Sequence, residues 1–317
     1  MRLLILSKES MPFESDALYT FIRAVTEADD EIVLRSVATN ADIAARLQDA
    51  TTFDRCVVAG DDQVIASALF ALRGLSVPVL VFPNGMENLY FESLGNSHEP
   101  AALAKACREG RTVSADLGLI SWSDPQGTIH THPFSCMVGF GFDATLLRTA
   151  IPNKEALGGL SYILAALSIK KIPRATFDIT LDNNRFTVDG IACLVANSPM
   201  LGADIEIVSG SSINDGTLDI VVVQATDSMR LIRPVFAGVL DHKGTNLGRP
   251  EMAHYQGVSV TVQSSEALPL QVNGEPTPYE INGYKARILQ GANQLIVDHV
   301  SPYAAVSIRE APQRDNR

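Results

Sequence analysis

The sequence lacks a long apolar run, and no stretch approaches the roughly 20 residues that a membrane-spanning helix needs. The N-terminal segment MRLLILSKES has an apolar run that is too short for a signal peptide and is typical of a first β-strand. Cysteine is scarce: four cysteines, Cys56, Cys107, Cys136 and Cys193, lie far apart in apolar segments and form no C-x-x-C pair. We therefore expect buried, reduced thiols and a cytoplasmic protein.

Basic residues are also fewer than acidic residues. The 317 residues include 25 Lys and Arg against 36 Asp and Glu, which gives a net charge of -11 at pH 7. This balance argues against broad nucleic-acid binding, which needs a basic face, and against adhesion to anionic lipid by bulk charge. Peripheral membrane contact stays open, because Lys170 and Lys171 end an apolar helical segment at residues 160–169. A core helix with a basic end is the simpler interpretation of that segment. Nothing in the sequence indicates an oligomeric state.

The composition is that of a core-forming chain of about two domains, with hydrophobic residues making up 46% of it. In the first third, apolar strand-like runs alternate with helical segments. The runs lie at residues 2–7, 31–37, 55–59 and 78–82, and the helical segments at 16–26, 42–50 and 62–72. This alternation predicts βαβ units around a parallel sheet, in which ligands bind at the carboxyl ends of the strands.

Strand-like runs dominate from about Arg111 onward. They lie at residues 112–122, 128–140, 176–182, 185–188, 191–196, 218–223, 258–262 and 268–272, with helices expected at 160–171 and 228–241. This pattern predicts a largely antiparallel β domain. The expected fold is therefore an N-terminal doubly wound α/β domain at residues 1–122 and a C-terminal β-sandwich domain with inserted helices at residues 123–296. Residues 297–317 are a candidate return to the first domain.

Two loops that follow buried strands of the first domain contain the candidate cofactor-binding residues. These are Gly60, Asp61, Asp62 and Gln63 in the segment VVAGDDQVI, and Gly85, Met86 and Asn88 in the segment PNGMENL. A glycine-containing loop between a strand and a helix lets backbone N–H groups approach a phosphate, with the helix N-terminus behind it. Both loops are therefore candidate phosphate-binding elements.

Two further segments lie in the β-rich part, INDGTLD at residues 213–219 and LQVNGEP at residues 270–276. Each of the four segments is weak evidence alone. Their order and spacing together resemble the diacylglycerol kinase and sphingosine kinase-like lipid kinase family over nearly the whole chain. The family's corresponding segments read G-G-D-G-T, P-x-G-T-x-N-D, N-D-G-x-L-D and D-G-E-P.

The resemblance implies an enzyme that uses ATP and magnesium to phosphorylate a lipid hydroxyl of the diacylglycerol or sphingoid type. Its first domain would bind the nucleotide and its second the lipid. A structural magnesium is implied at the Asp215 side chain with the carbonyl groups of Ser212 and Thr217, since oxygen ligands suit this ion. The implied catalytic residues are Asp61, Asn273 and Glu275. Asn273 stands where relatives have the aspartate that is proposed as the base.

Two departures from the family pattern leave the activity open. Asn273 cannot act as a general base, because an amide takes up no proton near neutral pH. Asp62 places a carboxylate where relatives have glycine, and this charge repels a triphosphate unless a metal ion lies between them. Three hypotheses follow: a lipid kinase in which Asp61, Asp62 or Glu275 supplies the base, a pseudokinase that binds lipid or nucleotide without phosphoryl transfer, and an enzyme with another phosphate donor.

Overall fold

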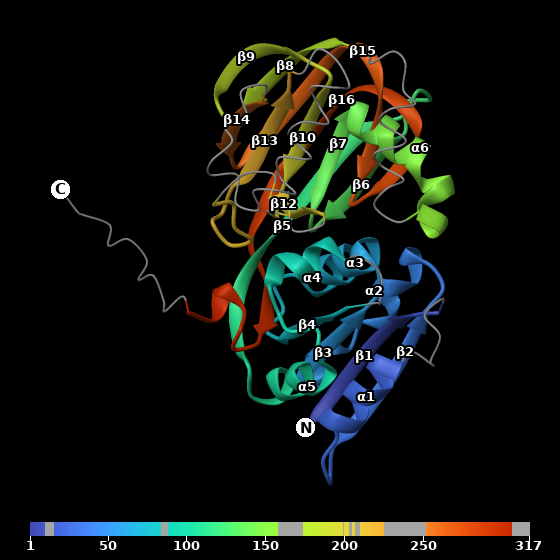
Figure 1. Ribbon diagram of the computed structural model, residues 1–317, viewed down its shortest axis with the longest axis vertical. Helices are drawn as coiled ribbons and strands as arrows, with labels where there is room; N and C mark the ends of the chain where they lie inside the picture. Colours follow the sequence, from blue (N-terminus) through green and yellow to red (C-terminus); the bar gives the residue numbers. More distant parts are fainter. Residues whose placement is uncertain are drawn as a thin grey trace, which may run out of the picture.

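The computed structural model describes residues 1–9, 16–83, 88–157, 174–198, 200–202, 205–206, 210–224 and 252–305. These residues form two lobes, an N-terminal α/β lobe and a β-rich lobe (Figure 1). Within these ranges no helix combines the length and the apolar character that a membrane crossing requires. The helices predicted at 160–171 and 228–241, and the candidate residues Gly85 and Met86, lie outside the described residues.

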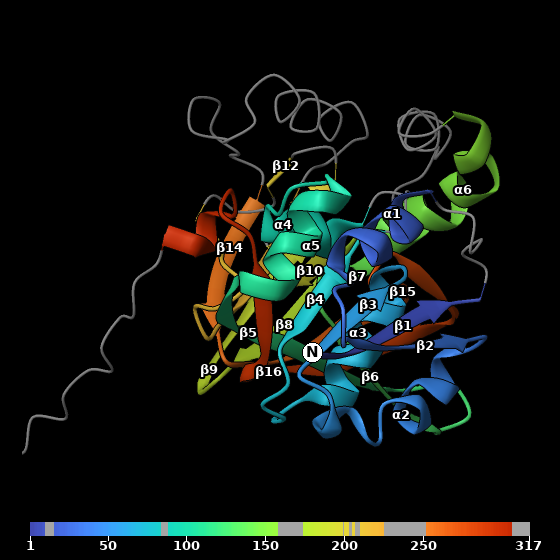
Figure 2. The same cartoon turned by 90° about the horizontal axis from the view of Figure 1, so that it is seen from below.

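Four parallel strands form the sheet of the N-terminal lobe. β1 (Arg2–Lys8) lies between β2 (Glu31–Val37) and β3 (Arg55–Ala59), and β4 (Val79–Phe82) follows β3. Helices lie on both faces of this sheet (Figure 2): α1 (Asp16–Val25), α2 (Ile43–Arg46), α3 (Asp62–Leu72), α4 (Leu89–Leu94) and α5 (Pro100–Glu109). Strands covered on both faces read as continuous apolar runs, and this is why the alternation of strand and helix was visible in the sequence. The helix predicted at 42–50 is shorter and ends at Arg46.

The β-rich lobe is mainly antiparallel. Its long hairpin joins β15 (Ser259–Val272) to β16 (Glu275–Val297). The other strands are β5 (Arg111–Ser123), β6 (Ile129–Phe134), β7 (Met137–Gly141), β8 (Ala175–Leu181), β9 (Asn184–Gly190), β10 (Ala192–Ala196), β13 (Leu218–Val223), β14 (Met252–Gly257) and the short pair β11 (Met200–Gly202) and β12 (Ile205–Glu206). Besides β16, β15 pairs with β8 near its start and with β7 near its end. The run predicted at 128–140 is two strands, β6 and β7, divided at Ser135 and Cys136.

Two strands continue from one lobe into the other. In β5, Leu117 belongs to the apolar cluster that contains the core of the N-terminal lobe, whereas Ile120 belongs to a second cluster that lies within the β-rich lobe. In β16, Ile288 belongs to the β-rich core, and Leu295 pairs in parallel with Val79 of β4. The lobes are thus joined by continuous hydrogen-bonded strands. The domain limits at residues 122 and 297 stay a prediction.

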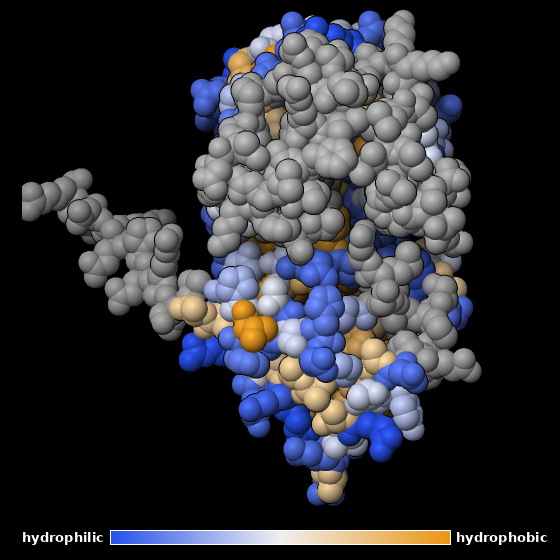
Figure 3. Space-filling model, in the orientation of Figure 1, coloured by the Kyte–Doolittle hydropathy of each residue, from blue (hydrophilic) through white to orange (hydrophobic). Residues whose placement is uncertain are grey.

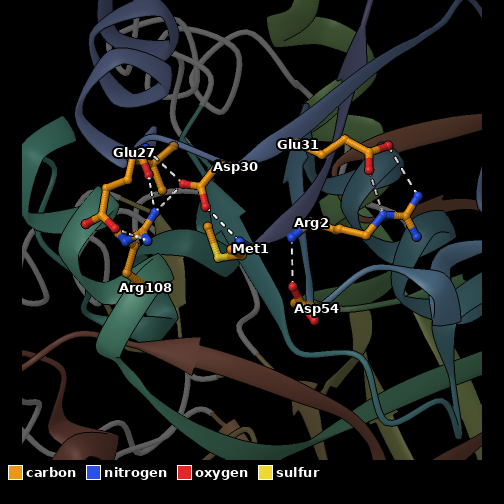
Figure 4. A network of polar contacts seen from close by, with 8 residues as sticks. Met1, Arg2, Glu27, Asp30, Glu31, Asp54 and Arg108 are labelled. Carbon is orange, nitrogen blue, oxygen red and sulfur yellow. Dashed lines mark hydrogen bonds and ion pairs between the residues drawn. The ribbon is translucent and has the colours of Figure 1, made fainter.

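A polar network fastens α5 to the start of β1 (Figure 4). The Arg108 guanidinium donates hydrogen bonds to Asp30 Oδ2 at 2.6 Å, Glu27 Oε2 at 2.5 Å and the Val25 carbonyl at 2.7 Å. The ammonium group of Met1 donates to Asp30 Oδ1 at 2.7 Å. The hydrogen bond from the ammonium group, and to a smaller extent that from Arg108, holds the pKa of Asp30 well below its ordinary value. This network ties α1, β1 and α5 together at the end of the lobe that lies away from the β-rich lobe (Figure 1).

Candidate functional site

The loop after β3 lies at the carboxyl end of the parallel sheet. Gly60 is required there because α3 approaches closely: a β-carbon on Gly60 would lie 2.6 Å from Val64 Cγ1. Asp61 has an extended backbone, and its Oδ1 accepts a hydrogen bond from the Val64 N–H at 2.9 Å. Asp61 is therefore the N-cap of α3. The loop predicted to bind phosphate thus leads directly into a helix N-terminus.

Lys8, the last residue of β1, brings a positive charge to this loop. Its Nζ lies 2.5 Å from Asp61 Oδ2, and about one third of each side chain is exposed, 32% for Lys8 and 39% for Asp61. Because β1 and β3 are parallel neighbours, their carboxyl ends place both residues at one edge of the sheet. The sequence patterns assigned Lys8 no role; its position at the end of a strand was the available signal.

The Asp62 side chain points into the protein and is only 9% exposed. Its carboxylate oxygens accept hydrogen bonds from the Leu89 and Tyr90 N–H groups, each at 3.1 Å. These N–H groups belong to the first turn of α4, so the carboxylate lies at that helix N-terminus. Burial raises the pKa of Asp62 to about 6, although the two backbone hydrogen bonds oppose the shift.

Asn88 and Gln63 connect this loop with its neighbours. Asn88 Nδ2 donates a hydrogen bond to the Gly60 carbonyl at 3.0 Å, and its Oδ1 accepts one from the Phe91 N–H at 2.9 Å, which caps α4. Gln63 Nε2 donates to the Val272 carbonyl at 2.6 Å. Val272 ends β15, so this bond runs from the N-terminal lobe to the β-rich lobe. The structure therefore brings residues 60–63, Asn88 and the β15–β16 turn together.

Asn273 occupies the β15–β16 turn in a left-handed conformation (φ 49°), which asparagine tolerates better than most residues. Its Oδ1 accepts hydrogen bonds from the Ser135 and Cys136 N–H groups, each at 3.1 Å, and its Nδ2 donates to the Pro133 carbonyl at 3.3 Å. Both ends of the amide are therefore used to hold the turn between β6 and β7. The side chain at the predicted catalytic position has a structural role.

Glu275, the first residue of β16, lies within electrostatic reach of the Lys8–Asp61 pair. Partial burial raises the pKa of Glu275, the charge of Asp61 raises it further, and Lys8 lowers it. A lysine and two carboxylates from both lobes therefore share the junction. In Figure 3 apolar and hydrophilic surface lie next to each other at the level where the lobes meet.

A further carboxylate lies behind the turn, at the start of α6 (Phe142–Leu157). Asp143 Oδ2 accepts a hydrogen bond from Gln271 Nε2 at 2.8 Å, and Gln271 Oε1 accepts one from the Gly274 N–H at 2.8 Å. Gly139 provides the space, because a β-carbon there would lie 1.8 Å from Asp143 Oδ2. Burial raises the pKa of Asp143. The sequence patterns did not identify this network. The available signal was the pair Gly139 and Gly141 in the segment GFGFDA at residues 139–144.

The turn predicted to hold magnesium is closed by its own side chains. Asp215 Oδ1 accepts hydrogen bonds from the Thr217 N–H at 2.9 Å and from the Thr217 hydroxyl at 2.8 Å. The Ser212 hydroxyl donates to Asn214 Oδ1 at 2.7 Å. Oxygen atoms therefore dominate this turn, which is the donor type that magnesium prefers.

Asp116 of β5, which the sequence patterns missed, lies beside that turn. Its two oxygens accept hydrogen bonds from the Gly216 and Gly291 N–H groups, both at 2.7 Å. Burial raises the pKa of Asp116, and the neighbouring charge of Asp215 adds to the shift. Among the described residues, no group of three or more His, Cys, Asp or Glu side chains could hold a metal ion. The magnesium site thus stays a prediction.

Asn197 connects this turn with the catalytic position. Its Nδ2 donates hydrogen bonds to the Asp116 carbonyl at 3.3 Å and to the Ser135 carbonyl at 3.0 Å. Ser135 in turn donates its N–H to Asn273 Oδ1. The predicted metal turn and the predicted catalytic turn are therefore linked through the interior of the protein by hydrogen bonds.

Sequence comparison finds a family profile and a characterised enzyme that are similar to this chain. The family profile described as "YegS C-terminal NAD kinase beta sandwich-like domain" matches residues 136–296. The diacylglycerol kinase of Bacillus subtilis (strain 168) is 25% identical over 269 residues, which are 83% of this chain and 81% of that protein.

Solved structures share the fold. A diacylglycerol kinase from Bacillus anthracis str. Sterne has a TM-score of 0.68 at 18% identity, over 94% of this chain and 97% of that chain. Yeast NADH kinase complexed with NADH has a TM-score of 0.54 at 10% identity, over 95% of this chain and 84% of that chain. At these identities the likeness establishes the fold, and the predicted α/β domain followed by a β-sandwich domain is confirmed.

Proposed function

Since this chain belongs to the diacylglycerol kinase-like (YegS-like) lipid kinase family, we propose that it transfers the γ-phosphate of ATP to a lipid hydroxyl. The observation that carries this proposal is the meeting of residues 60–63, Asn88 and the Asn273 turn at the junction of the two lobes. Phosphoryl transfer depends on positioning and on neutralising charge, and ligand sites are frequent at domain interfaces.

In this proposal the two loops of the N-terminal lobe bind the nucleotide, and the lipid enters the β-rich lobe. The nucleotide-binding residues are Gly60, Asp61, Asp62, Gln63, Gly85, Met86 and Asn88. Asp61 and Glu275 are the candidate proton acceptors. As the lipid oxygen attacks the γ-phosphorus, one of these carboxylates takes the hydroxyl proton and ADP leaves. The acceptor is a diacylglycerol or a sphingoid lipid.

Magnesium fits this proposal through the donor set of the 212–217 turn. Asp215 and the carbonyl groups of Ser212 and Thr217 would hold it, and the nearby Asp116 carboxylate adds negative charge that a cation would offset. The bound ion would supply positive charge at this turn. The proposed setting is the cytoplasm, with peripheral membrane contact to reach the lipid. The four cysteines, which are free and buried, support this setting.

A direct assay tests the proposal. The full chain is incubated with γ-labelled ATP, magnesium and mixed micelles that contain diacylglycerol or a sphingoid lipid. We expect labelled lipid from the unaltered chain and a loss of at least tenfold in rate for Asp61→Ala. Label that persists at full rate in Asp61→Ala would refute the role of Asp61, and absence of label with both lipids would refute the transfer reaction.

A second candidate function is binding of lipid or nucleotide without transfer. The observation that favours it is the Asn273 side chain, which accepts no proton and is fully engaged with backbone groups. Asn273→Asp keeps an oxygen acceptor for Ser135 and Cys136 and adds a carboxylate. Activity in Asn273→Asp but not in the unaltered chain would identify a catalytically impaired protein. Equal activity in both would show that the base lies elsewhere.

A further inference from the structure

We propose that Lys8 binds the terminal phosphate of the phosphate donor, and that it leaves Asp61 to do so. The inference rests on the proposed function, because it assigns a ligand contact within the same junction. The first step is geometric. Lys8 Nζ contacts Asp61 Oδ2 at 2.5 Å, directly at the N-terminus of α3. A phosphate bound at this helix end would lie next to the ammonium group.

The second step concerns charge. Asp61 and Glu275 both face the junction, and two carboxylates repel a polyphosphate strongly unless a cation lies among them. Lys8 contacts one of these carboxylates and is within electrostatic reach of the other. A compact ammonium group with three donors at the end of a flexible stem can change partners without a rearrangement of the backbone.

The third step concerns α4. The Leu89 and Tyr90 N–H groups are already taken by the Asp62 carboxylate, so this helix end offers them to no phosphate. These two backbone donors are therefore not free for a phosphate. Lys8, from the strand next to β3, offers a cation beside the α3 N-terminus instead.

The exchange of partners also prepares Asp61 for its proposed role. Asp61 Oδ1 stays bound to the Val64 N–H, which fixes the carboxylate, while Oδ2 is released when Lys8 turns to the phosphate. Oδ2 can then take the proton of the lipid hydroxyl as the new O–P bond forms and the bond to ADP breaks. Binding of the donor would thus free the base.

The test measures binding by calorimetry with two probes, magnesium-ATP and inorganic triphosphate. Lys8→Met should weaken both at least tenfold, since a charged hydrogen bond is lost, and Lys8→Arg should weaken them less. The matched control is Lys105→Met on α5, an exposed lysine whose substitution changes the net charge equally. We expect its affinities to stay within about twofold of those of the unaltered chain.

A double-mutant cycle separates this role from a structural ion pair. Asp61→Asn keeps an oxygen for the Val64 N–H, so the N-cap survives. Asp61→Asn should tighten triphosphate binding at least threefold in either background, because a carboxylate that repels the phosphate is gone. In the Asp61→Asn chain, Lys8→Met should still weaken binding at least tenfold, because the Lys8 contact with the phosphate does not depend on Asp61. If Lys8 only holds the α3 cap, Lys8→Met lowers the melting temperature and leaves both affinities unchanged, and this result overturns the inference.

The two probes also separate the inference from the proposed function. Triphosphate binding that needs Lys8, in a chain that does not bind ATP, supports the Lys8 contact and refutes ATP as donor. ATP binding that is unaffected in folded Lys8→Met and Lys8→Arg refutes the Lys8 contact and leaves the kinase proposal intact. A chain that binds neither probe refutes both the Lys8 contact and the kinase proposal.

Discussion

Polar side chains at the lobe junction are held mainly by backbone groups. The Asp62 carboxylate binds two N–H groups of α4, and the Asn273 amide binds the turn between β6 and β7. Asn88 uses one end of its amide for a helix cap and the other for the Gly60 carbonyl. Backbone groups move little, so these three side chains are fixed before any ligand arrives. Lys8 differs, because it contacts another side chain, Asp61, and is partly exposed to solvent.

Asp62 should make stability depend on pH. Its pKa is raised from 3.8 to about 6, so its protonated form stabilises the fold. This contribution is fully present below pH 3.8 and is lost as the pH rises through 6. Relative to Asp62→Asn, the unaltered chain should therefore lose up to about 3 kcal/mol of unfolding free energy between pH 4 and pH 7.5.

Urea unfolding at the two pH values measures this difference. The matched control is Asp29→Asn, an exposed position with φ 71° that asparagine accepts readily. We expect the control to show no comparable change with pH. A difference between Asp62→Asn and the unaltered chain that is constant from pH 4 to pH 7.5 would contradict the assignment.

Individual elements depend on single contacts with their neighbours. α5 is anchored by Arg108, which reaches the carbonyl of Val25 at the end of α1 and the carboxylates of Glu27 and Asp30. The beginning of α6 depends on Gly139 of β7, since this glycine leaves the space for Asp143. The first contact joins elements that are far apart in sequence, whereas Gly139 and Asp143 lie on consecutive elements; each contact can be tested with one substitution.

Arg108→Met should lower the melting temperature by several degrees at pH 7, because Glu27 loses this cation and Asp30 keeps the Met1 ammonium group but loses the guanidinium, while the apolar stem is kept. The lowered pKa of Asp30 means that its ionised form stabilises the fold above pH 3.8, and this contribution is lost as the pH falls below that value. The difference between variant and unaltered chain should shrink in acid. Thermal unfolding at pH 7 and pH 3 tests this, and a difference that grows in acid would refute it.

Gly139→Ala should destabilise the β-rich lobe by about 1–3 kcal/mol, because the added methyl group overlaps the Asp143 carboxylate and the Gln271 amide. Adding Asp143→Ala should recover part of the loss, since the nearest obstacle is then removed. Urea unfolding of the single and double variants gives both values. Additive losses in the double variant would show that the two residues do not interact.

The whole molecule has two apolar clusters: one contains the core of the N-terminal lobe and reaches β7, β10 and β13, and the other lies within the β-rich lobe. Both β5 and β16 supply residues to the two clusters. The Gln63–Val272 hydrogen bond adds a buried link at the site itself. Continuous strands limit how far the lobes can separate, so a ligand at the junction meets a surface that is largely formed in advance. This arrangement favours catalysis by positioning.

Gln63→Met should weaken this link while keeping the volume of the side chain. We expect a loss of about 1–3 kcal/mol, since the buried Val272 carbonyl loses its donor. Calorimetry measures the melting temperature and also shows whether the single transition expected of joined lobes separates into two. Gln63→Glu, which places an acceptor against the carbonyl, should be worse than Gln63→Met. If Gln63→Glu is as stable as the unaltered chain, the Gln63–Val272 hydrogen bond contributes nothing to stability.

Local sequence patterns predicted many of the helices and strands. Short continuous apolar runs and helical segments of period 3.6 predicted the strands and helices of the N-terminal lobe, because these patterns depend on neighbouring residues. The helix at Leu89–Leu94 and the strand at Arg55–Ala59 place Gly60 and Asn88 at the predicted sheet edge. Patterns could not divide residues 128–140 into two strands, because the turn there is held by Asn273, more than 130 residues away.

The sequence by itself determined the order of the elements, the class of the two domains and the positions of the candidate loops. Only the tertiary structure decided which partner each polar side chain has: Asp62 with α4, Asn273 with the β6–β7 turn, Lys8 with Asp61. The reason is that a hydrogen bond or ion pair needs two groups at one place, and the chain supplies them from distant positions. Gln63 and Val272, 209 residues apart, meet only because two strands of the folded chain bring the lobes together.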